Sequence, residues 1–342
     1  MLFVDVEESV AARKDDDAGV LFKESMSGAI GRVKEASVFV LDANAVTMGI
    51  NVWLGRPSSI IAALPFVRLP SPTVWIEFSN FAARDALASF GNDNQNLDGS
   101  VTIEKTGFLL TEKDGKIKME MIAQYASADR IKHIELLSAI CDFDIADDFS
   151  FEHLPLPIVA GNIKGDATGK AAKYYNMLAR DDSELKAQRE IKERFSGSTH
   201  PDFRPIMQKM SSVMSDDKLD GILQGHISDM KRLFTMQILP TLILLNCRNA
   251  VDTEHVAAPE KLNKTRRKKK RPEIGDYKLV KLHLNPQKRK IYEGSGATRQ
   301  QTEGGLVIGH FKVRKSGVYW WSPFWRGPLD SKGARRVNVI TT

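Results

Sequence analysis

The chain has 342 residues, of which 42% are hydrophobic and 27% charged, the composition of an ordinary globular protein with a core. No apolar run reaches the roughly 18–20 residues that a membrane span needs, and the N-terminal segment MLFVDVEESVAARKDDD lacks the features of a secretory signal. The two cysteines, Cys141 and Cys247, lie in apolar segments and form no Cys-x-x-Cys pair. We therefore expect buried free thiols in a reducing compartment, and neither a zinc site nor a membrane partner.

The net charge of +6 is distributed unevenly along the chain. From Lys261 to Thr342 there are 21 Lys and Arg residues against 5 Asp and Glu, so this segment carries +16 and the remainder −10. A basic tail on an acidic body predicts contact with a polyanion, of which RNA is the first candidate.

The N-terminal half of the chain shows helical and then strand patterns. Residues 18–53 are predicted to be mainly helical, with a break near Ala36, and Pro57 is typical of a helix start. The residues of Thr73–Phe78 favour a strand. Alternating residues on either side of Asp114-Gly115 predict a β-hairpin with one buried and one exposed face.

The next segments predict helices. Residues 170–195 are charged and helix-prone, with an interruption near residues 181–183. Residues 216–249 carry apolar side chains at steps of three and four and predict the longest core helix. Pro240 is expected to kink or split that helix.

A different pattern begins after the densest run of cations. Four strands are predicted there, at Tyr277–Leu284, Gly305–Arg314, Gly317–Trp325 and Val337–Ile340. The expected fold class is α+β: a mixed α/β body with a long core helix, plus a small antiparallel β module. The expected organisation is an acidic body at 1–255, a basic linker at 256–275 and the β module at 276–342.

Motifs for catalysis are weak in this sequence. The Gly-rich segment 161–172 departs from a phosphate-binding loop at two required positions, and the seven histidines are scattered. The carboxylates of Asp142, Asp144, Asp147 and Asp148 favour a solvated acidic loop over a cation site. Nothing therefore requires an enzyme, and no catalytic residue, metal or cofactor is expected.

Two groups of residues predict a nucleic-acid interface. Consecutive cations repel one another and stay solvated unless an anion neutralises them, which favours phosphate contact. Aromatic rings interleaved with cations on a strand favour stacking with unpaired bases. Because alternate side chains share a face, Trp320 and Trp321 must point to opposite sides. The candidate residues are Lys264, Arg266, Arg267, Lys268, Lys269, Lys270, Arg271, His310, Phe311, Lys312, Arg314, Lys315, Trp321 and Arg326.

The segment LVIGHFKVRKSGVYWWSPFWRG, together with KLNKTRRKKKRPEIGDYKLVKL before it, resembles the C-terminal signature of a family of phage and mobile-element proteins. One member of that family is a type V-A anti-CRISPR protein that lowers synthesis of its target nuclease. The resemblance implies a host–virus conflict protein that acts on translation in the cytoplasm of a bacterial host cell. The residues that match the signature are Gly309, His310, Phe311, Trp321, Arg326 and Gly327.

The leading hypothesis is therefore a non-enzymatic, anti-defence or regulatory protein of phage or mobile-element origin. Its basic C-terminal region would contact RNA or a translating message. Its body would bind a nascent peptide or host defence protein, by strand addition near Val74–Phe78 and the 107–122 hairpin. The alternatives are a metal-dependent nuclease centred on His310 or the 142–148 carboxylates, and a homo-oligomeric phage structural protein whose tail contacts DNA.

Overall fold

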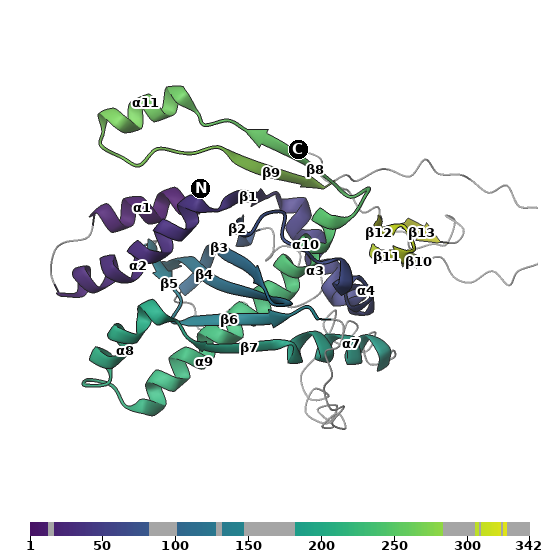
Figure 1. Cartoon of the computed structure of the whole chain (residues 1–342), viewed down its shortest axis with the longest axis horizontal. Helices are drawn as coiled ribbons and strands as arrows, with labels where there is room; N and C mark the ends of the chain where they lie inside the picture. The colour runs from purple at the N-terminus through teal and green to yellow at the C-terminus, as the bar shows by residue number, and fades with distance from the viewer. Residues whose placement is uncertain are drawn as a thin grey trace, which may run out of the picture.

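A nine-stranded mixed sheet forms the centre of the computed structural model, in the order β7-β6-β4-β3-β2-β1-β9-β8, with β5 also paired to β4 (Figure 1). The structure describes residues 1–12, 17–81, 101–127, 132–146, 182–282, 305–307, 309–322 and 324–326. The Gly-rich segment 161–172, Asp147, Asp148 and the strand expected at Val337–Ile340 lie outside these residues. The strands are β1 (Ser37–Leu41), β2 (Thr73–Ser79), β3 (Val101–Lys113), β4 (Lys116–Ser127), β5 (Lys132–Leu136), β6 (Ala139–Asp144), β7 (Phe195–Thr199), β8 (Val251–Val256) and β9 (Tyr277–Leu282).

Strand β1 lies in the middle of the sheet and is parallel to both of its neighbours, β2 and β9. The sequence predicted mainly helix across residues 18–53, and this is wrong at 37–41. A strand that is covered on both edges and both faces has a continuous run of apolar residues instead of an alternating pattern. The spacing of its apolar residues therefore does not distinguish it from a buried helix.

The predicted hairpin is confirmed as β3 and β4. Asp114 and Gly115 both have positive φ, 51° and 71°, as the tight turn of a two-residue hairpin requires. The predicted strand at Thr73–Phe78 is confirmed as β2, but it pairs with β1 on one side and β3 on the other. Strand addition near β2 and the hairpin is therefore wrong, because β2, β3 and β4 are interior strands with both edges hydrogen-bonded.

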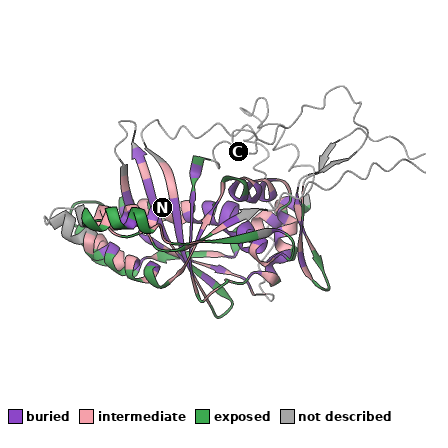
Figure 2. Cartoon of the chain, turned by 90° about the horizontal axis from the view of Figure 1, so that it is seen from above, coloured by how far each residue is buried: buried purple, intermediate pink, exposed green. Residues whose placement is uncertain are grey.

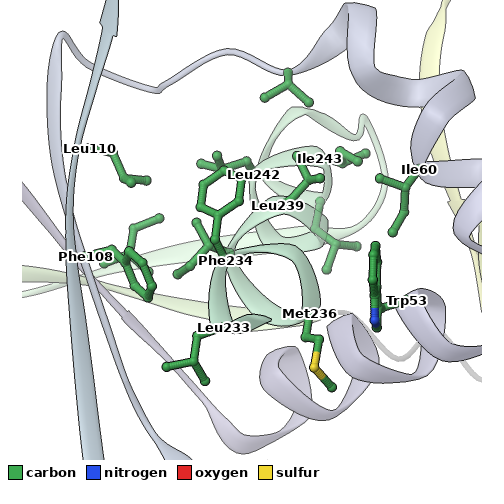
Figure 3. Packing of buried hydrophobic residues seen from close by; sticks show 14 of the residues in the cluster. Trp53, Ile60, Phe108, Leu110, Leu233, Phe234, Met236, Leu239, Leu242 and Ile243 are labelled. Carbon is green, nitrogen blue, oxygen red and sulfur yellow. The ribbon is translucent and has the colours of Figure 1, made fainter. Parts of the chain in front are cut away.

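Helices cover both faces of the sheet. Helices α1 (Leu2–Ala12) and α2 (Asp17–Glu35) pack through a small apolar cluster that includes Trp75, Leu109 and Ile122 of the sheet. The opposite face carries a larger cluster, which Figure 3 shows between the strand residues Phe108 and Leu110 and the helix residues Trp53 and Ile60. Figure 2 shows exposed residues on the helices and on peripheral strands and turns, around a largely buried interior. Most of the helical residues in the larger cluster come from α3 (Ala43–Gly55), α4 (Pro57–Ala63), α9 (Asp216–Leu233) and α10 (Leu239–Asn246).

The long core helix expected at 216–249 is present, and Pro240 interrupts it as predicted. Between α9 and α10 lies a π-helical turn, Phe234–Ile238, in which the Leu239 N–H bonds to the Phe234 carbonyl oxygen. Proline lacks an N–H and its ring crowds the preceding turn, so a widened turn just before Pro240 relieves both conflicts. The π-turn directs Phe234 toward Phe108 and Phe143, whose ring centroids lie 6.4 and 5.1 Å away.

A buried carboxylate fixes the start of helix α1. Glu77 of β2 accepts hydrogen bonds from the backbone N–H groups of Leu2 (3.1 Å) and Phe3 (3.3 Å) and from Trp75 Nε1 (3.0 Å). These bonds satisfy N–H groups that a helix N-terminus leaves without intrahelical partners, and they place a negative charge at the positive end of the helix dipole. Glu77 thus joins α1 to the sheet.

The C-terminal region is more closely joined to the body than a separate module would be. Small antiparallel pairs are present there, β10 (Gly305–Val307) with β13 (Phe324–Arg326), and β11 (His310–Arg314) with β12 (Gly317–Trp321). Together with the mixed sheet they confirm the α+β fold class. Strand β9, however, lies in the central sheet, and the segment expected as a linker contains helix α11 (Glu260–Lys268) between β8 and β9.

The remaining described helices are α7 (Asp182–Glu193) and α8 (Arg204–Met210), besides short 3-10 turns at Leu64–Phe66 and Pro201–Phe203. Within the described part of the chain, no helix combines the length and the apolar character needed to cross a membrane.

Candidate nucleic-acid interface

Helix α11 and the residues after it form a basic cap, defined here as residues 264–271, at the end of the β8–β9 arm (Figure 1). The buried Asn263 closes the arm: its Nδ2 donates to the Ile274 carbonyl oxygen (2.7 Å) and its Oδ1 accepts from the Ile274 N–H (2.8 Å). Arg266 Nε donates to the Pro272 carbonyl oxygen (2.6 Å), and its guanidinium pairs with Glu8 of α1. Arg266 therefore anchors the cap to the body.

The other cations of the basic cap differ in their partners. Arg267 pairs with Glu273 (2.9 Å) at an exposed position. A set of five cations is exposed and forms no ion pair with any residue that the structure describes. These five are Lys264, Lys268, Lys269, Lys270 and Arg271. Their mutual repulsion is relieved by bound anions, so the cap is a surface suited to phosphate.

The β11–β12 hairpin has two chemically different faces. Its register pairs His310 with Trp321, Lys312 with Tyr319 and Arg314 with Gly317. These residues share one side, because cross-strand partners and alternate positions point the same way. We call this side the outer hairpin face: His310, Lys312, Arg314, Tyr319 and Trp321. The inner face carries Phe311, Val313, Val318 and Trp320.

The inner face is docked on the body. Phe311 and Trp320 are 4% and 3% exposed and belong to the main apolar cluster, with Val318. Asn249 behaves like a strand partner of Trp320: its Oδ1 accepts from the Trp320 N–H (2.9 Å) and its Nδ2 donates to the Trp320 carbonyl oxygen (3.0 Å). The Arg248 N–H donates to the Val318 carbonyl oxygen (3.2 Å). This docking leaves the outer face directed away from the core.

On the outer face, cations and rings are already in contact. Lys312 Nζ lies 4.0 Å from the centroid of the Trp321 ring, within cation–π range. The His310 ring lies 5.9 Å from Trp321 at an interplanar angle of 44°. Trp321 remains 36% exposed, and the Tyr319 hydroxyl lies 3.0 Å from Ser316 Oγ at the turn. The arrangement offers ring surfaces for stacking beside ammonium and guanidinium groups for phosphate.

The structure sorts the residues expected from the sequence. The prediction that Trp320 and Trp321 point to opposite faces, one of them into the core, is confirmed. The placement of Phe311 at the interface is wrong, because strand alternation puts its side chain in the core opposite Trp320. Lys315 is exposed at the turn. For Arg326 the structure describes only its backbone pairing with Gly305.

Two further residues belong to this surface. Tyr319 lies on the outer hairpin face. The sequence could have predicted this, because Tyr319 is two residues from Trp321 and alternate residues of a strand share a face. Arg248 lies beside the turn: its Nε is 3.2 Å from the position that a Cβ atom on Gly317 would occupy. Nothing in the local sequence predicts that Arg248 lies there. Gly317 itself has φ of 132°, a conformation that other residues rarely adopt.

The basic cap and the outer hairpin face are separate surfaces. Figure 1 shows α11 near one end of the longest axis, above α1, and the β11–β12 hairpin well toward the other end. The sequence places both in one basic segment, but β9 runs through the central sheet between them. A single bound strand that touches both must therefore cross the body.

Of the carboxylates and thiols considered from the sequence, those that the structure describes make no catalytic arrangement. Asp144 Oδ1 accepts from the Ala146 N–H (2.8 Å), as in a local turn. Nowhere in the described ranges do three His, Cys, Asp or Glu side chains gather so as to hold a metal ion. Cys141 and Cys247 are free and buried as predicted, and burial raises the pKa of each thiol to about 12. Such thiols are poor nucleophiles.

A partly buried ionic network joins α2, β4 and the turn after β7. Arg32 donates to Glu120 (2.6 Å) and Asp202 (2.9 Å), and His200 Nε2 lies 3.1 Å from the same Glu120 oxygen. Burial alone would raise the pKa of Glu120. Hydrogen bonds from His200 and Arg32 outweigh that effect and hold the pKa below its ordinary value. The network thus connects α2, β4 and the turn after β7, which are distant from one another in the sequence.

His226 of α9 forms a second polar contact with the sheet. Its Nδ1 lies 2.7 Å from Ser138 Oγ and accepts from the Ser138 N–H (3.1 Å), while Nε2 lies 3.7 Å from Glu135. The grouping has the residue types of a hydrolase triad, but Ser138 is completely buried, so no substrate reaches its hydroxyl. Its role is to fasten α9 to the β5–β6 turn.

This contact predicts a loss of stability in mild acid. Burial lowers the pKa of His226, partly offset by Asp229, so the unfolded chain binds the proton at higher pH than the folded protein. Neutral His226 makes its full contribution to the free energy of unfolding above the pKa of the unfolded chain, about 6.5. Below that pH the free energy of unfolding decreases by at most about 1.4 kcal/mol per pH unit. Urea unfolding between about pH 8 and 5.5 measures the decrease.

The variant His226→Asn tests whether His226 causes this pH dependence. In His226→Asn an amide oxygen replaces Nδ1 as the acceptor, and the titrating group is removed. The variant should show a shallower decrease over the same pH range. An identical slope in both proteins would mean that another group is responsible.

Comparison of the chain with protein families, curated proteins and solved structures finds no match to any family model, curated protein or solved structure.

Proposed function

We propose that this protein binds single-stranded RNA through the outer hairpin face and the basic cap, without catalysing a reaction on it. The observation that carries the proposal is the outer hairpin face, where Trp321 and Tyr319 lie beside Lys312, Arg314 and His310 on the side turned away from the core. Base stacking on an aromatic ring contributes about 1–3 kcal/mol per base and needs an unpaired base. A duplex offers no such base to this face.

The basic cap supplies the electrostatic part of binding. Five of its cations form no ion pair with any residue that the structure describes. These cations neutralise RNA phosphates and release the counterions condensed on them, so the affinity for RNA depends steeply on salt. Arg266 is excluded from this set because Glu8 already holds it. The cap therefore binds without regard to sequence, while the hairpin distinguishes single strands from duplexes.

The wider role that we propose is anti-defence or regulatory, in a phage or mobile element acting within its bacterial host. The support for this role is the resemblance of the C-terminal segment to the phage and mobile-element family. Of the residues that carry that resemblance, His310 and Trp321 lie on the outer hairpin face. A protein or nascent-peptide partner for the body is part of the same proposal. Strand addition by such a partner would have to use an edge strand such as β8.

Charge reversal in the basic cap tests its contribution. Changing Lys264, Lys268, Lys269, Lys270 and Arg271 to Glu should weaken binding of single-stranded RNA by about a hundredfold or more at moderate salt. The slope of log K against log salt should become shallower by about 0.7 for each phosphate that the variant no longer neutralises. Filter binding across a salt series measures both quantities.

The matched control reverses five exposed lysines elsewhere: Lys113, Lys116, Lys118, Lys209 and Lys218. It changes the net charge by the same amount, so it corrects for general repulsion of RNA. If both variants lose affinity equally, the basic cap has no special role and binding reflects net charge alone.

A further inference from the structure

Arg248 of the body fills a position on the outer hairpin face that the hairpin itself leaves empty. Gly317 pairs with Arg314, so a side chain at position 317 would lie on the outer face beside that of Arg314. The Nε, Cδ and Cζ atoms of Arg248 lie 3.2, 3.8 and 3.9 Å from the place of the missing Cβ atom. The Arg248 N–H bonds to the Val318 carbonyl oxygen (3.2 Å), which holds the residue beside the turn. Two arginine side chains from distant parts of the chain therefore flank the turn on one face.

These two arginines keep their full charge. Arg248 and Arg314 are exposed, and neither forms an ion pair with any residue that the structure describes. Lys315, the next residue of the turn, is exposed as well. By contrast, the guanidinium groups of Arg32 and Arg56 on the body are each paired with a carboxylate. Adjacent like charges repel one another, so an anion bound between Arg248 and Arg314 is favoured.

Hydroxyl groups lie at the same end of the face. The Tyr319 hydroxyl is 3.0 Å from Ser316 Oγ at the turn. A phosphate placed there can accept hydrogen bonds from hydroxyl groups as well as from guanidinium groups, whose planar N–H pairs match phosphate oxygens. The outer hairpin face thus has a direction, with guanidinium and hydroxyl groups at the turn and the rings of His310 and Trp321 at the far end.

We propose that the turn end of the outer hairpin face binds the terminal phosphate of a single-stranded RNA, at its 5′ or its 3′ end. The proposal rests on the RNA binding proposed above and names the feature of the RNA that the site prefers. A phosphate monoester carries about −1.5 to −2 charges at pH 7, whereas an internal phosphodiester carries one. Two guanidinium groups without carboxylate partners therefore favour the monoester.

The spacing of the face agrees with this arrangement. Trp321 is four residues from Gly317, about 14 Å along the strand at about 3.4 Å per residue. Tyr319 lies between them on the same face. A phosphate at the turn consequently leaves the bases next to the RNA end over the rings of Tyr319 and Trp321, where they can stack.

Fluorescence anisotropy with one internally labelled RNA sequence tests the site. The RNA carries a 5′-phosphate, a 3′-phosphate or hydroxyl groups at both ends. One phosphorylated form should bind the full-length protein about tenfold more tightly than the hydroxyl form. Arg248→Gln should lower that ratio to about twofold or less. The hairpin should stay docked in this variant, because the contact of Arg248 with Val318 is made by its backbone N–H.

Two controls separate a terminal-phosphate site from general attraction. A hydroxyl-ended RNA that is two nucleotides longer adds a similar charge through internal phosphates and should gain about twofold or less. Arg204→Gln removes an exposed arginine from α8, which Figure 1 shows far from the hairpin, and should keep the tenfold ratio.

The outcomes distinguish this proposal from the one on which it rests. Equal affinity for phosphorylated and hydroxyl ends, an equal gain from the longer strand, or an unchanged ratio in Arg248→Gln would overturn the terminal-phosphate site and leave RNA binding intact. Absence of binding by all of these RNAs would overturn RNA binding itself, and the terminal-phosphate site with it.

Discussion

Replacing Glu77 with alanine is expected to lower the free energy of unfolding by about 3–5 kcal/mol, because three buried donors lose their acceptor at once. Two of these donors are backbone N–H groups in the first turn of α1, and the third is the indole of Trp75, which is completely buried. Water cannot replace the carboxylate at the indole without opening the cluster beneath α1. Urea unfolding followed by circular dichroism measures the loss.

Two further variants define what the loss means. Glu77→Gln keeps one acceptor oxygen and should lose less than the alanine variant. Glu112→Ala is the control: this carboxylate accepts one backbone N–H, from Leu69 (2.9 Å), at a partly exposed position, and its removal should cost about 1 kcal/mol or less. If Glu77→Ala is no less stable than Glu112→Ala, the Glu77 carboxylate does not hold α1 to the sheet.

Replacing Trp321 with alanine should weaken binding of single-stranded RNA by about five- to a hundredfold, the effect of losing one stacked base. In the free protein Lys312 occupies one side of the ring at 4.0 Å. That cation–π contact is worth about 0.5–1 kcal/mol at an exposed position, less than the stacking of a base, so a base displaces the ammonium group. The released Lys312 is then free to approach a phosphate. Fluorescence anisotropy with labelled RNA measures the change.

The controls for this prediction come from the same hairpin. Trp321→Phe retains a smaller ring and should recover part of the affinity. Val313→Thr changes a half-exposed residue on the inner face and should bind as the wild type does. Because Trp321 is not in the core, both Trp321 variants should keep the melting temperature of the wild type. Full affinity in Trp321→Ala would show that the outer hairpin face does not stack bases.

Much of the outer hairpin face could be predicted from the sequence, because it depends on local backbone geometry. In a hairpin the two-residue period alone decides that Trp320 and Trp321 face opposite sides. That Trp320 is the inner one follows from the docking of the hairpin on the body. The Asp114-Gly115 turn and the interruption at Pro240 were predictable for the same reason, since each follows from the backbone preferences of one or two residues.

Other features depend on contacts between distant residues and could not be predicted. Six consecutive cations argue against a helix through their repulsion, yet α11 includes Arg266–Lys268. Its position is fixed by Asn263 bonding to Ile274 and by Arg266 reaching Glu8, which lies more than 250 residues earlier in the chain. In the same way, β1 is a strand because β2 and β9 hydrogen-bond to it from both sides.

We propose that a surface bearing cations and rings in the C-terminal third binds single-stranded RNA. Its most direct test is the affinity of the unmodified protein for one labelled RNA, presented single-stranded and as a duplex, over salt from about 50 to 300 mM. We predict tighter binding of the single strand at every salt concentration, with log K falling linearly as log salt rises. Equal affinity for both forms, or no saturable binding of either, would show that this surface does not bind single-stranded RNA selectively.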